Sequence, residues 1–121
     1  MRRLSRILVV EDDDDLREQV ATCIEEMGVA VDRARDGMEG FERLAACNSL
    51  PGAILLDMRM PRLDGAGFLK ALRAKPDLAH IPVITMTGGD LPLQEAPVAS
   101  QLSKPFDVEE LARILVSLCE E

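Results

Sequence analysis

The feature that most constrains this chain is a short apolar run that ends in one carboxylate. Residues 53–56 are all apolar, Asp57 follows them directly, and the turn-forming residues Pro61, Asp64 and Gly65 come soon after. A continuous apolar run of this length, bounded by turn signals, is typical of a strand that is buried on both faces. Open α/β sheets place their ligands at the carboxyl ends of such strands. We therefore expect Asp57 at the mouth of a crevice, as a nucleophile or a metal ligand.

The rest of the chain alternates short strand-like segments with helical patterns. The other strand-like segments are residues 7–10, 29–34, 83–87 and 101–103. Apolar residues at helical spacing begin at Leu16, Met38, Phe68 and Val108. This order predicts an α/β fold with a doubly wound, five-stranded parallel sheet. Pro92 and Pro97 interrupt the segment between the last two strands, so we expect a fourth helix there to be shortened or absent.

A run of acids, residues 11–15, follows the first strand-like segment. Acids favour a helix N-terminus, and Asp14 and Asp15 directly precede a helical pattern, so we assign them to the start of that helix. Crowded carboxylates at a strand end can also hold a hard cation such as Mg²⁺. We assign Glu11 and Asp12, together with Asp57, to such a metal site. For Asp13 both explanations stay open.

Two more polar side chains follow strand-like segments, and a parallel sheet brings these strand ends to one edge. Thr87 precedes two glycines, and Lys104 follows the last strand-like segment. A hydroxyl beside glycines leaves room for an anion near backbone N–H groups, although Thr is also an ordinary strand residue before a turn. Together with the acids, these residues indicate a site for a divalent cation and a phosphoryl group, which Asp57 can attack in line. It is not a Walker-type nucleotide site, because the required Gly-rich run is missing.

Composition limits the class of protein and of partner. With 121 residues, 47% of them hydrophobic, the chain has the size of one domain, to which we assign residues 1–121. The net charge of -8 argues against direct binding to nucleic acid or to an anionic membrane. The cysteines have no metal-like spacing and indicate thiols in a reducing compartment. No apolar run suits a signal peptide or a membrane span, so we expect a cytoplasmic protein.

In this order and spacing, the site segments resemble the receiver domain of two-component response regulators, and the resemblance covers nearly the whole chain. The matching segments are residues 7–12, 57–61, 64–65, 82–88 and 104–106. The resemblance implies a flavodoxin-like sheet with the strand order 2-1-3-4-5. It also implies a phosphoacceptor signalling module, whose phosphorylation changes its conformation and thereby regulates the binding of a partner.

The same resemblance gives roles to the acids. Asp57 accepts a phosphoryl group from a phosphohistidine on a sensor histidine kinase or phosphotransfer protein, or from a small acyl phosphate. Asp12, Asp57 and the backbone carbonyl of Arg59 bind Mg²⁺, and Glu11 reaches the metal through water. Such a domain is not an enzyme for other substrates, because it catalyses only its own phosphotransfer and dephosphorylation. Its output passes to a downstream protein or to a C-terminal effector domain.

For the switch, the resemblance makes Thr87 the moving hydroxyl and Lys104, held by a cis bond to Pro105, the phosphoryl-binding lysine. Two features depart from the common receiver pattern. Many receivers carry an aromatic residue three positions before the lysine, where this chain has Gln101, and most have a full fourth helix. The resemblance therefore extends to the phosphorylation chemistry but not to the usual output switch.

Two other functions compete with the phosphoacceptor. An aspartate-nucleophile phosphohydrolase commonly needs a second acid two residues after the nucleophile, where this chain has Arg59. A pseudo-receiver, which only binds partners, would be expected to lose the acids, Thr87 or Lys104, and this chain keeps all of them. His80 lies in a loop without a second residue to make it a base or a metal ligand. The phosphoacceptor is the leading interpretation, and the pseudo-receiver is the alternative.

Overall fold

The strands and helices alternate along the chain as the apolar patterns predict. The computed structural model describes residues 6–46, 50–57, 65–87, 100–103 and 108–119. The elements are β1 (Arg6–Val10), α1 (Asp14–Glu26), β2 (Ala30–Ala34), α2 (Gly37–Ala46), β3 (Ala53–Asp57), α3 (Gly65–Arg73), β4 (Val83–Thr87), β5 (Ser100–Ser103) and α4 (Val108–Cys119). Segment 88–99, where a shortened or absent helix was predicted, lies outside the described residues.

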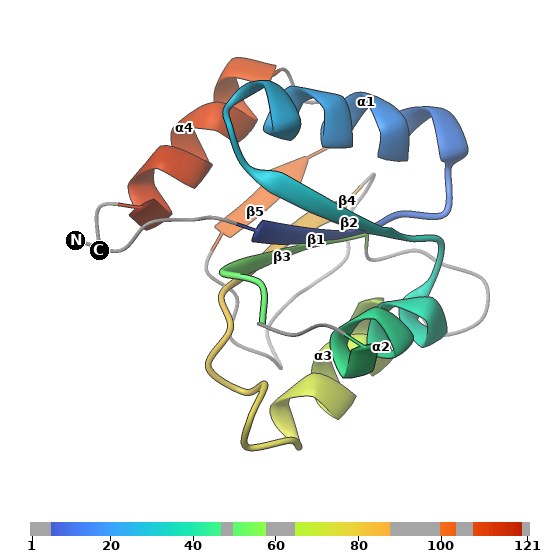
Figure 1. Cartoon of the computed structure of the whole chain (residues 1–121). Coiled ribbons are helices and arrows are strands. Elements are labelled where there is room, and N and C mark those ends of the chain that lie inside the picture. The colour runs from blue at the N-terminus through green and yellow to red at the C-terminus, as the bar shows by residue number, and fades with distance from the viewer. Residues whose placement is uncertain (1–5, 47–49, 58–64, 88–99, 104–107, 120–121) are drawn as a thin grey trace.

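The strands form one parallel sheet in the order β2-β1-β3-β4-β5. Helices α1 and α4 cover one face of this sheet, and α2 and α3 cover the other (Figure 1). The predicted class, a doubly wound α/β fold of the flavodoxin-like type, is confirmed. Each described helix is too short or too polar to cross a membrane.

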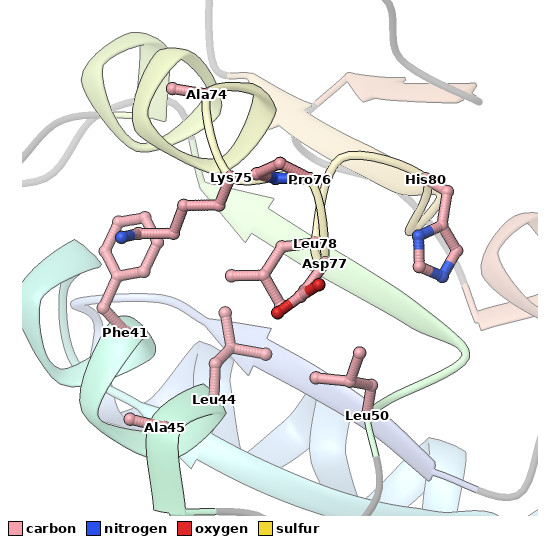
Figure 2. Close-up of a pocket in the computed structure, with 10 residues that line it drawn as sticks. All are labelled: Phe41, Leu44, Ala45, Leu50, Ala74, Lys75, Pro76, Asp77, Leu78 and His80. Carbon is pink, nitrogen blue, oxygen red and sulfur yellow. The ribbon is translucent and has the colours of Figure 1, made fainter.

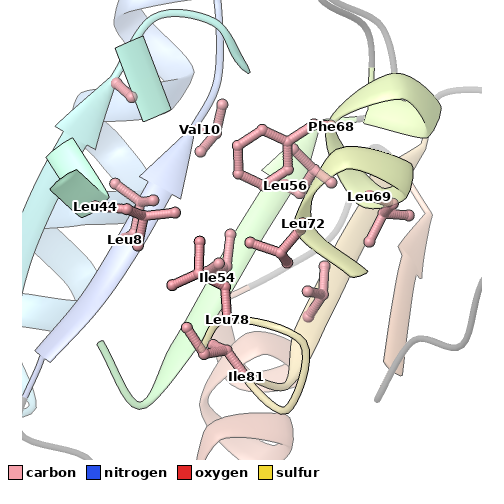
Figure 3. Packing of buried hydrophobic residues seen from close by; sticks show 12 residues of the cluster. Leu8, Val10, Leu44, Ile54, Leu56, Phe68, Leu69, Leu72, Leu78 and Ile81 are labelled. Atoms are coloured by element: carbon pink, nitrogen blue, oxygen red, sulfur yellow. The ribbon is translucent and has the colours of Figure 1, made fainter. Parts of the chain in front are cut away.

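The apolar runs of β1 and β3 are explained by burial on both faces. Side chains alternate along a strand, so Leu8 and Val10 face α2 and α3, whereas Ile7 and Val9 face α1 and α4. In β3 the residues 53–56 alternate in the same way, and all of them are fully buried. Figure 3 shows the cluster on the α2 and α3 side. Burial of each large aliphatic side chain contributes about 1.5–3 kcal/mol, which makes these two strands the centre of the fold.

Helix α2 approaches the sheet closely because Gly40 has no side chain. A Cβ atom at Gly40 would lie 3.0 Å from Cε1 of Phe68 and 3.3 Å from Cγ2 of Val10. The rings of Phe41 and Phe68 pack next to this contact, with their centroids 4.7 Å apart. A larger residue at position 40 would therefore push α2 away from Phe68 or from β1.

Candidate functional site

The acid cluster lies where β1 and β3 end side by side. Val10 of β1 pairs with Leu56 of β3, so the next residues, Glu11 and Asp57, are neighbours at the carboxyl edge of the sheet. Asp12 follows Glu11, and carboxylate oxygens of all three residues lie within 4.8 Å of one another. The structure thus brings together the three carboxylates that the sequence places at this edge. We call Glu11, Asp12 and Asp57 the acid cluster.

The acid cluster combines burial with like charge. Glu11 is fully buried and Asp57 is 2% exposed, whereas Asp12 is exposed to solvent. Carboxylates that are this close repel one another, and burial strengthens the repulsion. A divalent cation offsets this cost, and oxygen-only ligand sets suit hard ions such as Mg²⁺ and Ca²⁺. The donor set therefore fits a magnesium ion, with Asp12 on the solvent side.

Asp13 belongs to the start of α1. Of the two explanations that the sequence leaves open for Asp13, helix capping and metal binding, the structure shows the first. Its Oδ1 accepts a hydrogen bond of 3.1 Å from the backbone N–H of Leu16, so Asp13 is the N-cap. Its own N–H donates to Oε2 of Glu11 at 3.1 Å. Asp14 and Asp15 lie in the first turn of α1, as predicted. Asp13 thus caps the helix and also orients the Glu11 carboxylate.

Thr87 is the last residue of β4, and its backbone reaches the same edge of the sheet. In the register of the sheet, Asp57 pairs with Met86, the residue that precedes Thr87, and Thr87 pairs with Ser103 of β5. The predicted residues Arg59, Lys104 and Pro105 lie outside the described residues. Their assigned roles stay predictions.

Arg17 is a residue of this region that the sequence analysis did not single out. Its Nη1 donates to the backbone carbonyl of Glu11 at 3.1 Å, and its Nη2 donates to Oδ1 of Asp14 at 2.7 Å. One signal in the sequence pointed to it, because Arg17 is a basic residue that closely follows the run of acids. Charge alone, however, does not show that a side chain binds the backbone of the preceding loop.

A groove lies at the opposite edge of the sheet. It has a volume of about 1090 Å³ and lies between the end of α2 and the segment that joins α3 to β4. In Figure 2, Leu44 and Leu78 point toward each other from its two walls, and Asp77 and His80 lie on the α3–β4 side. Among the described residues, the acid cluster is the one group of His, Cys, Asp or Glu side chains that could hold a metal. The chemistry is therefore expected at the carboxyl edge and not in this groove.

The segment that carries Leu78 and His80 is held by Arg73. The Nη1 atom of Arg73 donates to the backbone carbonyl of Ala79 at 2.5 Å and to that of Ile81 at 3.1 Å. Burial of the guanidinium lowers the pKa of Arg73 below its usual value. The group is still charged at neutral pH, because the ordinary pKa of an arginine lies far above neutrality.

Sequence comparison identifies relatives for almost the whole chain. The family model described as the response regulator receiver domain matches residues 7–116. The response regulator MprA from Mycobacterium sp. (strain KMS) is 37% identical over 111 residues, which cover 88% of this chain and 46% of that protein. The MprA protein from Mycobacterium avium (strain 104) is 36% identical and is covered to 47%. The chain thus spans about half the length of the curated relatives that it matches.

Solved structures give the same result for the fold. The signal receiver domain of a signal transduction histidine kinase from Syntrophus aciditrophicus superposes with a TM-score of 0.88, at 30% identity, over 96% of this chain and 90% of that one. The receiver domain of the sensor histidine kinase PA1611 from Pseudomonas aeruginosa PAO1 superposes with a TM-score of 0.86, at 27% identity, over 98% of this chain and 100% of that one. That structure holds a magnesium ion in its active site cleft.

Proposed function

The chain belongs to the family of response regulator receiver domains, and from this we propose that it is a phosphoacceptor signalling module in which Asp57 accepts a phosphoryl group with the help of Mg²⁺. The observation that carries the proposal is the convergence of the Glu11, Asp12 and Asp57 carboxylates to within 4.8 Å at the carboxyl edge of the sheet. The magnesium ion in the cleft of the PA1611 receiver domain supports the same choice of metal.

In the proposed reaction, Asp57 is the nucleophile. A carboxylate oxygen of Asp57 attacks the phosphorus of a phosphohistidine or of a small acyl phosphate, in line with the leaving group. A P–O bond to Asp57 forms while the bond to the imidazole nitrogen or to the acyl oxygen breaks, and the leaving group keeps the electron pair. A Mg²⁺ ion held by the acid cluster would neutralise charge on the phosphoryl oxygens. Lys104 and the hydroxyl of Thr87 contact these oxygens and neutralise the rest of their charge.

The acids share the work of holding the metal. Asp12, Asp57 and the backbone carbonyl of Arg59 would hold Mg²⁺, and Glu11 would act through a water molecule. The carboxyl group of Glu11 is fully buried, and a cation beside it would offset the cost of its negative charge. Attack of water on the aspartyl phosphate later returns Asp57 to its carboxylate form. The domain therefore catalyses its own phosphorylation and dephosphorylation and acts on no other substrate.

The partners follow from this chemistry. The phosphoryl donor is a sensor histidine kinase or a phosphotransfer protein, in keeping with the response regulators among the relatives. Phosphorylation shifts a conformational equilibrium and so changes the affinity for a downstream protein or for an effector domain. The net charge of -8 argues against nucleic acid as a direct partner of this domain. We place the reaction in the cytoplasm.

Mass spectrometry of the intact protein tests the phosphoryl acceptor. With Mg²⁺ and acetyl phosphate, the wild-type chain should gain one phosphoryl group, and Asp57→Asn should gain none. Asp77→Asn, which changes an aspartate of the groove at the opposite edge, should be labelled like the wild type. Undiminished labelling of Asp57→Asn would show that another residue accepts the phosphoryl group. A wild-type protein that stays unlabelled would favour the pseudo-receiver.

Thermal unfolding with and without Mg²⁺ tests the division of the acid run. A ligand that binds the folded state raises its stability by mass action, so Mg²⁺ should raise the melting temperature of the wild type. Asp12→Ala should lose this response, because Asp12 belongs to the acid cluster. Asp15→Ala should keep it, because Asp15 lies in the first turn of α1. Equal loss in both variants would mean that the metal is bound elsewhere in the run.

A further inference from the structure

Arg17 connects the loop that carries the acid cluster to the helix that follows it. Its guanidinium donates to the backbone carbonyl of Glu11 and to the carboxylate of Asp14 through different nitrogen atoms, at 3.1 and 2.7 Å. The side chain is 13% exposed, although it lies at the surface end of α1. A planar guanidinium with two such partners fixes their relative positions in a way that a single point charge cannot.

The position of Arg17 is electrostatically unfavourable for α1 itself. The helix begins at Asp14, so Arg17 lies next to its N-terminus. A helix N-terminus carries partial positive charge and favours acids over cations. Arg17 makes a longer ion pair of 3.8 Å with Glu18 of the helix, and its shorter contacts are those to the loop and to Asp14. The contact to the loop bears on the geometry of the acid cluster.

The backbone of Glu11 is held from two sides. Its N–H donates to the carbonyl of Ala34 in β2 at 3.0 Å, and its carbonyl accepts from Arg17 at 3.1 Å. The first contact continues the pairing of β1 with β2, so it ends where the sheet ends. Beyond that point, the side chain of Arg17 contacts the peptide unit between Glu11 and Asp12. Repulsion among the carboxylates would otherwise move Asp12 away from Asp57.

We propose that Arg17 is a positioning residue of the metal site, which holds the peptide between Glu11 and Asp12 so that both carboxylates face the same cation as Asp57. This inference rests on the proposed function and deepens it. Arg17 contacts neither the metal nor the phosphoryl group in this scheme. It acts through the backbone, as residues behind a metal ligand commonly do, and loss of such residues typically weakens metal binding about 10–100-fold.

The direction in which the Mg²⁺ affinity changes when Arg17 is replaced distinguishes a positioning role from a purely electrostatic one. Removal of a positive charge beside the acid cluster would, by Coulomb attraction alone, strengthen the binding of a cation. Loss of a positioning contact has the opposite effect, because the ligands must then be reordered when the metal binds. The affinity for Mg²⁺ in Arg17→Met therefore tells which role the guanidinium has.

Calorimetric titration with Mg²⁺, without any phosphoryl donor, provides the test. We expect Arg17→Met to bind Mg²⁺ about tenfold more weakly than the wild type and Arg17→Lys to fall between them, since an ammonium can reach the carbonyl but cannot bridge both partners. Arg73→Met is the matched control, because Arg73 also donates to backbone carbonyls but does so at the opposite edge. It should lower the free energy of unfolding without changing the Mg²⁺ affinity. Urea unfolding identifies any variant that is not folded.

The outcomes are distinct. An Mg²⁺ affinity of Arg17→Met that equals or exceeds that of the wild type would overturn the positioning role and leave the proposed function intact. An equal loss of affinity in Arg73→Met would also overturn it, because the effect would then follow stability and not position. A wild-type protein that binds no Mg²⁺ would instead contradict the proposed function itself.

Discussion

Glu11 and Asp57 of the acid cluster are nearly as deeply buried as the apolar residues of β1 and β3 beside them, yet the two groups act on stability in opposite directions. Leu8, Val10, Ile54 and Leu56 pack against α2 and α3 with at most 1% of their surface exposed. The residues that directly follow β1 and end β3, Glu11 and Asp57, are buried to the same degree. Burial of apolar groups stabilises the fold, whereas burial of like charges destabilises it.

Folding stability and the functional site therefore depend on different residues of the same strands. The alternating side chains of β1 and β3 provide the free energy of folding, and the residues at the strand ends use part of it to hold carboxylates close together. Functional sites commonly reduce stability in this way. Substitutions in the apolar cluster should therefore lower stability and leave the chemistry intact, whereas substitutions in the acid cluster should do the reverse.

The largest effect is expected at Phe68, in the centre of the apolar cluster. Phe68 is fully buried, so Phe68→Ala should lower the free energy of unfolding by about 3–5 kcal/mol. Phe41→Ala is the control, because Phe41 is only partly buried against the same cluster, and its loss should be smaller. Urea unfolding measures both values. Equal losses would mean that the ring of Phe68 is not the main contact of α3.

A smaller loss of about 1–3 kcal/mol is expected for Gly40→Ala. Alanine favours a helix by about 1 kcal/mol over glycine, but its Cβ would lie 3.0 Å from a ring atom of Phe68. We expect the contact cost to prevail, because the ring of Phe68 is fully buried. In the double variant with Phe68→Leu, the cost should shrink, which a double-mutant cycle detects. A stabilised Gly40→Ala protein would show that α2 can shift freely.

In the acid cluster, a substitution should raise the free energy of unfolding instead of lowering it. Without Mg²⁺, Asp57→Asn should raise the free energy of unfolding by about 1 kcal/mol, because one of the crowded charges is removed. With Mg²⁺ at about 100 times its Kd, the wild type should gain about 2.7 kcal/mol and become the more stable of the two. Urea unfolding with and without Mg²⁺ shows which of the two proteins is the more stable under each condition. If Asp57→Asn is the less stable protein without Mg²⁺, the carboxylates do not repel one another strongly.

The smallest effect concerns a polar group inside the apolar region. Thr85 of β4 is fully buried, and its Oγ1 has no hydrogen-bond partner in the part of the chain that the structure describes. Thr85→Val keeps the shape and removes the buried hydroxyl, so it should raise stability by about 0.5–1 kcal/mol. Thermal unfolding at matched buffer measures this gain. Ser at the same position is the control and should be less stable than Thr, since it keeps the hydroxyl and loses a methyl group.

The fold and the acid cluster were largely predictable, because both follow from short patterns. The continuous apolar runs of residues 7–10 and 53–56 indicate strands buried on both faces, and parallel strands bring Glu11 and Asp57 to one edge. The contacts of individual side chains were not predictable. Those of Asp13 depend on the backbone angles of one residue at a helix start, with φ -78° and ψ 113°. The close approach of Gly40 to Phe68 joins two helices, and neither the local spacing of residues nor the composition predicts such a contact.

The parallel pairing of β1 also has a consequence for how the chain reaches its fold. β1 precedes both of the strands between which it lies: Ile7 pairs with Val31 of β2 and with Ala53 of β3. During synthesis, Ile7 to Val10 stay unpaired until β2 and β3 have been made, and unpaired apolar strands favour association with other chains. Charged residues beside such a segment oppose its association with other chains. We therefore expect the acids of residues 11–15 to oppose aggregation of the nascent protein before it folds, at a stage when no metal site exists.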